Sequence, residues 1–113
     1  MSRYADLDDG EVLWRRVHED HYEDGRVTSA AFKGFDMSVD RAKLQEDRAA
    51  TLKHGVGVAQ FTAAEARRHD QQPVAAPNPG EPAHALVRGH KSKGISRAFA
   101  RLARFIPRDE FVP

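Results

Sequence analysis

The chain has 113 residues, of which 40% are hydrophobic and 31% are charged, and its net charge is +1. This composition is too apolar for a disordered chain and too charged for a membrane protein, and the length fits one domain. The absence of cysteine excludes disulfides, thiolate zinc sites and cysteine nucleophiles. We therefore expect a small single domain with a cytoplasmic location.

The first part of the chain is expected to begin loosely and then form a strand. Residues 1–10 are acidic and predict a loosely ordered leader before one domain over residues 11–113. Residues 11–18 (EVLWRRVH) predict a strand whose alternate side chains point to opposite faces, Val12, Trp14 and Arg16 to one and Leu13, Arg15 and Val17 to the other. Asp24-Gly25 is a turn signal, and residues 27–32 are expected to be a short extended segment.

The middle of the chain is expected to hold a helix and then a strand. Ser38 is a candidate helix N-cap, and the thin apolar face that follows it ends at Gly55, a plausible helix stop. Residues 56–61 (VGVAQF) predict a central strand. Gly57 weakens that strand or marks a close approach of another segment.

Four further signals follow in chain order. Thr62 and Glu65 have the spacing of a capping box, which predicts a helix of about two turns. Residues 72–76 predict a short strand. Three prolines make residues 77–82 a stiff turn that cannot join a central ladder. Residues 83–88 (AHALVR) predict another strand.

Residues 95–106 are expected to form an amphipathic helix that Pro107 stops. Its apolar stripe recurs at helical spacing and consists of Ile95, Phe99, Leu102 and Ile106. A nearly opposite stripe is basic and consists of Lys93, Arg97, Arg101, Arg104 and Arg108. The apolar stripe can then pack on the core while the basic stripe faces outward.

The order of these elements predicts an α+β fold. We expect a small sheet of about four strands, with helices packed on one face and the amphipathic helix at the C-terminal end. The sequence does not predict the order of the strands in the sheet.

The segment before the amphipathic helix is the strongest candidate for binding an anion. Backbone N–H groups and the positive end of the helix dipole meet there, although the spacing of a P-loop is absent. With the stripe, it defines our candidate binding residues: Arg88, His90, Lys91, Ser92, Lys93, Arg97, Arg101, Arg104 and Arg108. Arginine favours bidentate contact with phosphate or carboxylate, so the expected partner is nucleic acid or an acidic protein surface. Alternatively, residues 1–50, which hold 12 Asp/Glu against 8 Lys/Arg and are called here the acidic first half, pair with the stripe within one molecule or in a dimer.

A metal site is a weaker hypothesis. His18 and His21 lie among four carboxylates in residues 18–24, which a divalent metal could use. The segment leads into the Asp24-Gly25 turn, so we interpret it as a solvated turn and expect neither a metal nor a cofactor.

An enzymatic alternative rests on three residues in a particular order. Arg15 or Arg16 is followed by Ser38 and, late in the chain, by Glu81. This order resembles one class of ADP-ribosyltransferases, in which the arginine and serine hold NAD and the glutamate orients the acceptor. The chain departs from that class because Glu81 lies in a proline turn and because such domains are larger.

Several stretches resemble a family of short bacterial proteins of unknown function. They are Thr28–Phe32 (TSAAF), Met37–Asp40 (MSVD), Pro82–Leu86 (PAHAL) and Lys91–Lys93 (KSK). The resemblance implies a bacterial cytoplasmic protein and carries no activity.

The favoured hypothesis is a non-catalytic binding or accessory protein that docks an anionic partner through its basic helix, without a membrane. It requires an exposed arginine stripe. The alternative is a small enzyme acting on a phosphate-bearing or NAD-type substrate. That alternative requires a cavity that holds at least two of Arg16, Ser38, His84 and Glu81.

Overall fold

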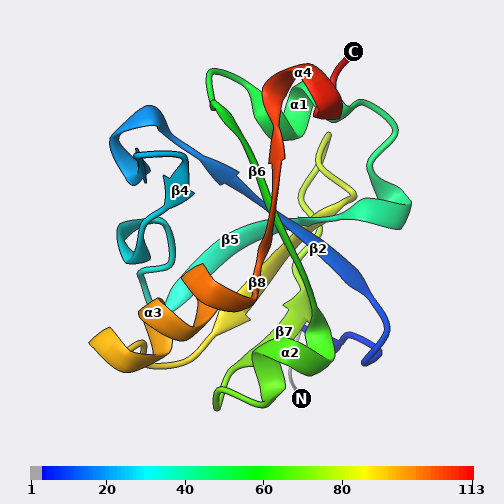
Figure 1. Cartoon of the computed structure of the whole chain (residues 1–113). Coiled ribbons are helices and arrows are strands. Elements are labelled where there is room, and N and C mark those ends of the chain that lie inside the picture. The colour runs from blue at the N-terminus through cyan, green and yellow to red at the C-terminus, as the bar shows by residue number, and fades with distance from the viewer. Residues whose placement is uncertain (1–3) are drawn as a thin grey trace.

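Seven strands form one antiparallel sheet in the computed structural model, which describes residues 4–113 (Figure 1). The strands are β1 Ala5–Asp6, β2 Val12–Val17, β5 Asp36–Arg41, β6 Gly57–Thr62, β7 Gln72–Ala75, β8 His84–Arg88 and β9 Arg104–Pro107. Their order across the sheet is β1–β7–β8–β5–β2–β6–β9, and every neighbouring pair is antiparallel. A separate hairpin pairs β3 Tyr22–Glu23 with β4 Arg26–Val27 across the Asp24-Gly25 turn.

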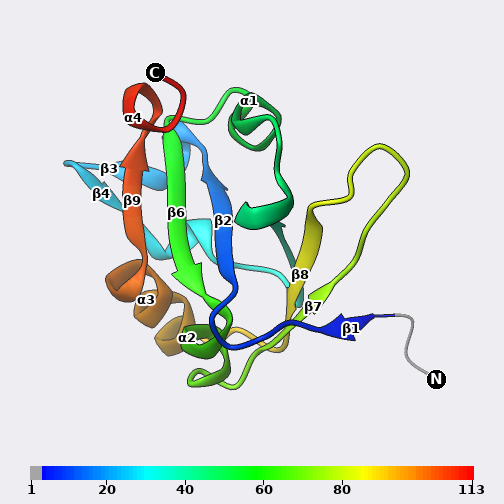
Figure 2. The same ribbon diagram turned by 90° about the vertical axis from the view of Figure 1, so that its right-hand side faces the viewer.

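Short helices cover both faces of this sheet. They are α1 Arg48–Leu52, α2 Ala63–Arg67, α3 Lys93–Leu102 and α4 Arg108–Phe111, with 3-10 turns η1 Glu19–His21, η2 Ser29–Ala31 and η3 Ala42–Leu44. Residues of α2, α3 and η2 belong to the larger core on one face, here called the inner face. Residues of α1 and α4 belong to a smaller cluster on the other, outer face. Figure 2 shows the two helix pairs at opposite ends of the long strands.

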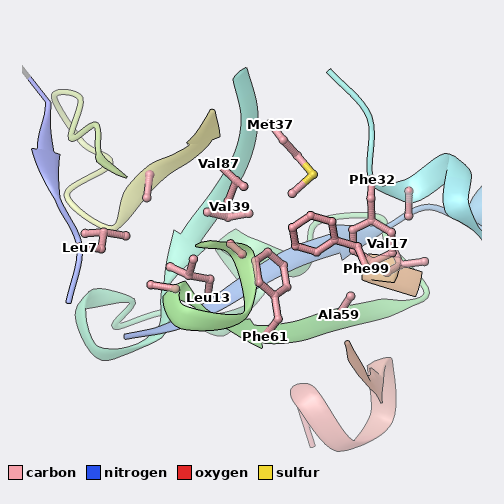
Figure 3. Close-up of a cluster of buried hydrophobic side chains, with 14 residues drawn as sticks. Leu7, Leu13, Val17, Phe32, Met37, Val39, Ala59, Phe61, Val87 and Phe99 are labelled. Carbon is pink, nitrogen blue, oxygen red and sulfur yellow. The ribbon is translucent and has the colours of Figure 1, made fainter. Parts of the chain in front are cut away.

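The inner core is built around Phe99 of α3. Its ring stacks on Phe32 at a centroid distance of 5.6 Å and meets Phe61 of β6 edge-on at 5.1 Å. Figure 3 shows these three rings gathered among aliphatic side chains from β2, β5, β6 and β8. Because alternate residues of a strand face the same way, each strand gives this core every second side chain.

The outer cluster uses the intervening residues of the same strands. Trp14 of β2 packs edge-on against Phe111 of α4, with ring centroids 4.7 Å apart, and contacts Leu52 and Val58. The indole Nε1 of Trp14 donates a hydrogen bond to Gln60 Oε1 at 2.9 Å, so its polar atom is satisfied. Apolar packing on both faces explains why the central strands are buried.

The expected α+β fold, with about four strands and helices on one face, is wrong. The chain forms a β-rich antiparallel sheet of seven strands and carries helices on both faces. The largest error lies at Ser38, which stands in the middle of β5 and does not cap a helix. Met37 and Val39 are buried while Ser38 is exposed, and β5 pairs with β2 and β8 on its two sides. Pairing on both edges outweighs the local cap signal.

The amphipathic helix is shorter than predicted. It ends at Leu102, Ala103 is extended with ψ 138°, and residues 104–107 form β9. The cause is a long-range pairing with β6, where Gly57 lies opposite Pro107. A Cβ at Gly57 would lie 2.4 Å from the backbone oxygen of Ile106, so the close approach considered for this glycine is present.

Other local predictions are confirmed. Strands are present at β2, β6, β7 and β8, and the capping box is complete: Thr62 Oγ1 accepts from Glu65 N–H, and Glu65 Oε1 accepts from Thr62 N–H. In the leader, Ala5–Asp6 pairs with β7, while residues 1–3 lie outside the described residues. The radius of gyration, 13.1 Å, is typical of one domain of this length.

Glu11 joins the start of β2 to the end of β5. Its side chain is 1% exposed, and Arg41 donates to both carboxylate oxygens at 3.0 Å. Lys43 Nζ lies 3.3 Å from Glu11 Oε1. Burial alone raises the pKa of Glu11, but the bonds to Arg41 and Lys43 outweigh it and hold the pKa below its ordinary value.

This lowered pKa predicts an acid sensitivity that Glu11 carries. A carboxyl whose pKa is lower in the folded state adds stability above its unfolded pKa, and that stability is lost as pH falls through the folded value. Below about pH 4.5, the free energy of unfolding should therefore fall more steeply in the wild type than in Glu11→Gln. Urea denaturation across this range measures it, with exposed Glu46→Gln as the control. Equal pH dependence in the wild type and Glu11→Gln would contradict the prediction.

Candidate functional site

The outer face carries a polar cavity of about 510 Å³, here called the outer cavity. It lies between α1 and the connection from β7 to β8, which Figure 2 shows on the same side of the sheet. Its chemically active lining residues are Arg16, His18, Ser38, Asp40, Thr51, Lys53, Glu81 and His84. A volume of this size suits a small molecule.

The sheet register explains why these residues meet. Trp14 of β2 is paired with Asp40 of β5, and Asp40 is paired with His84 of β8, so three strands contribute one row of side chains. Arg16 and Ser38 lie two residues away from Trp14 and Asp40 on their strands and so face the same side. The strands that bury phenylalanines on one face therefore present polar groups on the other.

Arg16 has hydrogen-bonding capacity that the fold leaves unused. Its Nε is buried and has no partner among residues 4–113. Arg15, on the opposite face, instead donates Nε to Ala31 O and Nη1 to Ser38 O, each at 2.9 Å. Gly55 makes room for Arg16, because a Cβ there would lie 2.7 Å from the Arg16 Cγ. A buried donor without an acceptor costs about 1–3 kcal/mol, and no contact of the described chain fixes the Arg16 guanidinium.

Ser38 and His84 form a hydrogen-bonded pair in the same cavity. His84 Nε2 lies 3.3 Å from Ser38 Oγ, and His84 Nδ1 lies 2.8 Å from the carbonyl oxygen of Ala76. A carbonyl oxygen only accepts, so Nδ1 carries the proton. In the neutral ring, Nε2 is then the acceptor and faces the Ser38 hydroxyl.

The acidic groups of the cavity differ in how freely they can meet a ligand. Asp40 Oδ2 accepts from Thr51 Oγ1 at 2.6 Å and from Gln45 Nε2 at 3.3 Å, which ties α1 to β5. Glu81 is exposed at the rim, where Asn78 Nδ2 donates to it at 3.4 Å. Asp40 therefore shapes the wall, while Glu81 is open to a ligand.

The cavity meets the condition that the sequence set for an enzymatic interpretation. That condition asked for at least two of four residues, and the cavity is lined by all four: Arg16, Ser38, His84 and Glu81. Sequence reasoning missed Asp40, Thr51 and Lys53. Asp40 could have been found from its period-two spacing to Ser38, whereas Thr51 carries no local signal.

Three of the predicted basic binding residues have side-chain partners within the molecule. Arg88 Nε donates to Asp36 Oδ1 at 2.8 Å, and Arg108 Nη1 donates to the carbonyls of Lys53 and Gly55. Lys91 Nζ lies within 3.4 Å of four carbonyl oxygens, those of Gly34, Phe35, Val87 and Gly89. Burial and the neighbouring charge of Arg15 lower the pKa of Lys91 to about 8. These cations hold the fold together and are less available to a partner.

The remaining predicted residues are on the surface or at the helix start. Ser92 Oγ accepts from Ile95 N–H at 3.2 Å and so caps α3. His90 is exposed, as are Lys93 and Arg104. Arg104 and Arg108 lie beyond the end of α3, so the predicted five-residue basic stripe is reduced on this helix to three residues.

Arg97 and Arg101 line a second, shallower cavity of about 470 Å³, here called the arginine groove. Arg26 of β4 contributes a third guanidinium, which sequence reasoning did not connect with the helix. The floor is apolar and consists of Val27, Ala100, Ala103 and Phe105. Within residues 4–113, these three arginines take part in no ion pair or hydrogen bond, so the acidic first half does not neutralise them.

The His18–Asp24 segment does not gather into a metal cluster. The rings of His18 and His21 meet edge-on with centroids 5.8 Å apart. Over the described range, no group of three or more His, Asp or Glu side chains is placed to hold a metal ion. No helix in that range is long and apolar enough to cross a bilayer.

Comparison with known proteins adds no family. No protein-family model matches the chain, and no curated protein or solved structure matches it either. The two cavities are therefore the basis on which a function can be proposed.

The structural role of Lys91 predicts a loss of stability on its removal. Lys91→Met leaves several carbonyls without their donor, so the free energy of unfolding should fall by about 1–3 kcal/mol. Lys93→Met is the matched control, since Lys93 is exposed two residues away and should change stability by less than about 0.5 kcal/mol. Urea denaturation measures both. If the two variants were equally stable, the tethering role of Lys91 would be refuted.

Proposed function

We propose that the protein binds a small phosphate-bearing molecule in the outer cavity. Arg16 carries this proposal, because its guanidinium lines the cavity without a hydrogen bond or ion pair to the described chain and because arginine matches phosphate geometry. Lys53 adds a second cation to the lining.

The other lining groups favour a ligand that is more than a bare phosphate. Glu81 and Asp40 would repel an isolated anion, whereas sugar hydroxyls can donate to a carboxylate. A nucleotide-like molecule satisfies both requirements, with phosphate at Arg16 and hydroxyls near Glu81. Such a ligand belongs to the same class as the phosphate-bearing or NAD-type substrate of the enzymatic alternative.

Removal of the Arg16 guanidinium should weaken binding of such a ligand. ADP-ribose and NAD should bind the wild type more tightly than adenosine, which shares the base and ribose but lacks phosphate. Arg16→Gln should weaken ADP-ribose binding by roughly ten- to a hundredfold, because a hydrogen bond to a charged group contributes about 1.5–3 kcal/mol. Isothermal titration calorimetry measures both effects.

Arg97→Gln is the control, because Arg97 lies in the other cavity. It should leave ADP-ribose binding unchanged. The proposal fails if adenosine and ADP-ribose bind equally, or if Arg97→Gln weakens binding as much as Arg16→Gln does.

A second candidate function is docking of an acidic protein surface on the arginine groove. Three unpaired guanidinium groups around an apolar floor suit a segment that carries carboxylates beside one apolar side chain. Nucleic acid is less favoured, because Arg88, Lys91 and Arg108 already have partners and the net charge is only +1. The docking hypothesis drawn from the sequence is thus kept, but of its candidate binding residues only Arg97 and Arg101 line the groove.

The groove predicts selective binding of an acidic peptide. A fluorescent peptide with one phenylalanine among glutamates should bind, and the Arg97→Gln/Arg101→Gln double variant should bind it at least about tenfold more weakly. The matched control is Lys93→Gln/Arg104→Gln, which removes the same charge elsewhere. Fluorescence anisotropy measures both. Tighter binding of duplex or single-stranded DNA, with a steep salt dependence, would favour nucleic acid instead.

The cytoplasmic location and the dimer considered from the sequence stay predictions. They are compatible with either candidate function and support neither.

A further inference from the structure

We propose that Ser38 is a nucleophile activated by His84, and that the outer cavity cleaves an acyl ester that carries an anionic group. The inference rests on the proposed ligand site, because it needs a molecule held in that cavity. It goes beyond binding, since it assigns a covalent step to a particular oxygen.

The geometry supplies the parts that such a step requires. An activated serine needs a base within hydrogen-bonding reach and a third group that orients the base. Ser38 Oγ lies 3.3 Å from His84 Nε2, and the Ala76 carbonyl holds the opposite ring nitrogen at 2.8 Å. The contact of 3.3 Å is long, as contacts between catalytic groups often are before a substrate binds.

The pair is not needed to hold its strands together. β5 and β8 are already paired over five residues, from Asp36↔Arg88 to Asp40↔His84. Ser38 is exposed, so its hydroxyl can be reached from solvent. The single hydrogen bond between Ser38 and His84 therefore adds little stability to this strand pair. Its effect is to orient the hydroxyl and the imidazole toward each other.

Arg16 gives the site its preference for charged esters. It lines the same cavity and has an unpartnered donor. A carboxylate or phosphate on the substrate can be anchored there while the ester lies at Ser38. The substrate class is therefore an ester with an anionic substituent.

Ser38 cleaves the ester in two stages, through an acyl-serine intermediate. The proton of Ser38 Oγ passes to His84 Nε2 while Oγ forms a bond to the carbonyl carbon. The bond from that carbon to the leaving oxygen breaks, and His84 returns the proton to the leaving alcohol. Water then attacks the acyl-serine ester, His84 accepts its proton, and a carboxylic acid is released as Ser38 regains its hydrogen.

Covalent labelling tests the nucleophile directly. Diisopropyl fluorophosphate should label the wild type at Ser38, as mapped by peptide mass spectrometry, with loss of fluoride. Ser38→Ala should not be labelled there. His84→Gln should be labelled at least roughly 100-fold more slowly, because general-base assistance contributes about that much or more.

Ser29 provides the matched control serine. It is half-exposed and lines the arginine groove, with no histidine among the residues lining that groove. It should remain unlabelled in every variant. Equal labelling of Ser29 and Ser38, or an unchanged rate in folded His84→Gln, would overturn the proposal. Circular dichroism and urea denaturation establish that the variants are folded.

Hydrolysis of two esters tests the substrate class. The wild type should cleave 4-acetoxybenzoate, which carries a carboxylate, and phenyl acetate, which does not. Arg16→Gln should lower kcat/KM at least about tenfold more for 4-acetoxybenzoate than for phenyl acetate. An equal loss on both esters would overturn the anionic preference.

The two proposals for the outer cavity fail separately. Ser38 labelling without ADP-ribose binding would leave the nucleophile standing and remove the nucleotide-like ligand. ADP-ribose binding without labelling would overturn the nucleophile and leave the binding site standing.

Discussion

The two-sided packing of β2 and β5 is the constraint on which the rest of the structure depends. Each strand gives alternate residues to the phenylalanine-rich inner core, and the intervening residues face the outer side. The short helices α1 and α4 cover the part of that side around Trp14. The part left over, between α1 and the β7–β8 connection, is the outer cavity. The cavity is thus a direct result of a sheet wider than the helices that cover it.

The basic residues of the molecule include two contrasting groups: those that donate hydrogen bonds to the backbone and those that have no acceptor in the described chain. Arg15, Lys91 and Arg108 donate hydrogen bonds to backbone carbonyl oxygens, so they stabilise loops and strand ends. Arg16 and the arginines of the groove meet no acceptor in the described chain. The sequence alone therefore does not show which basic side chains stabilise the fold and which are free to bind a partner, because that depends on the surrounding backbone.

Local signals in the sequence were sufficient to predict the elements that are stabilised by residues close to them in the sequence. The Thr62–Glu65 capping box and the strand around Trp14 were predictable because their cause lies within a few residues. β9 was not predictable, since Phe105 and Ile106 fit a helix until β6 pairs with them. Ser38 was misassigned for the same reason. Of the outer cavity, Arg16, Ser38, Glu81 and His84 could be grouped as a hypothesis, but Thr51 enters through a tertiary contact alone.

The sheet order has a consequence for when the outer cavity exists. Its walls come from β2, β5 and β8, which neighbour one another in space although the chain visits β6 and β7 between β5 and β8. Sheets with such distant pairings fold slowly relative to helical bundles, because the entropy of loop closure is lost before the non-local contacts form and stabilise the chain. An unfolded chain has no arrangement of Arg16, Ser38 and His84 to offer. Any molecule that occupies the cavity will therefore bind only folded chains and shift the folding equilibrium toward them as its concentration rises.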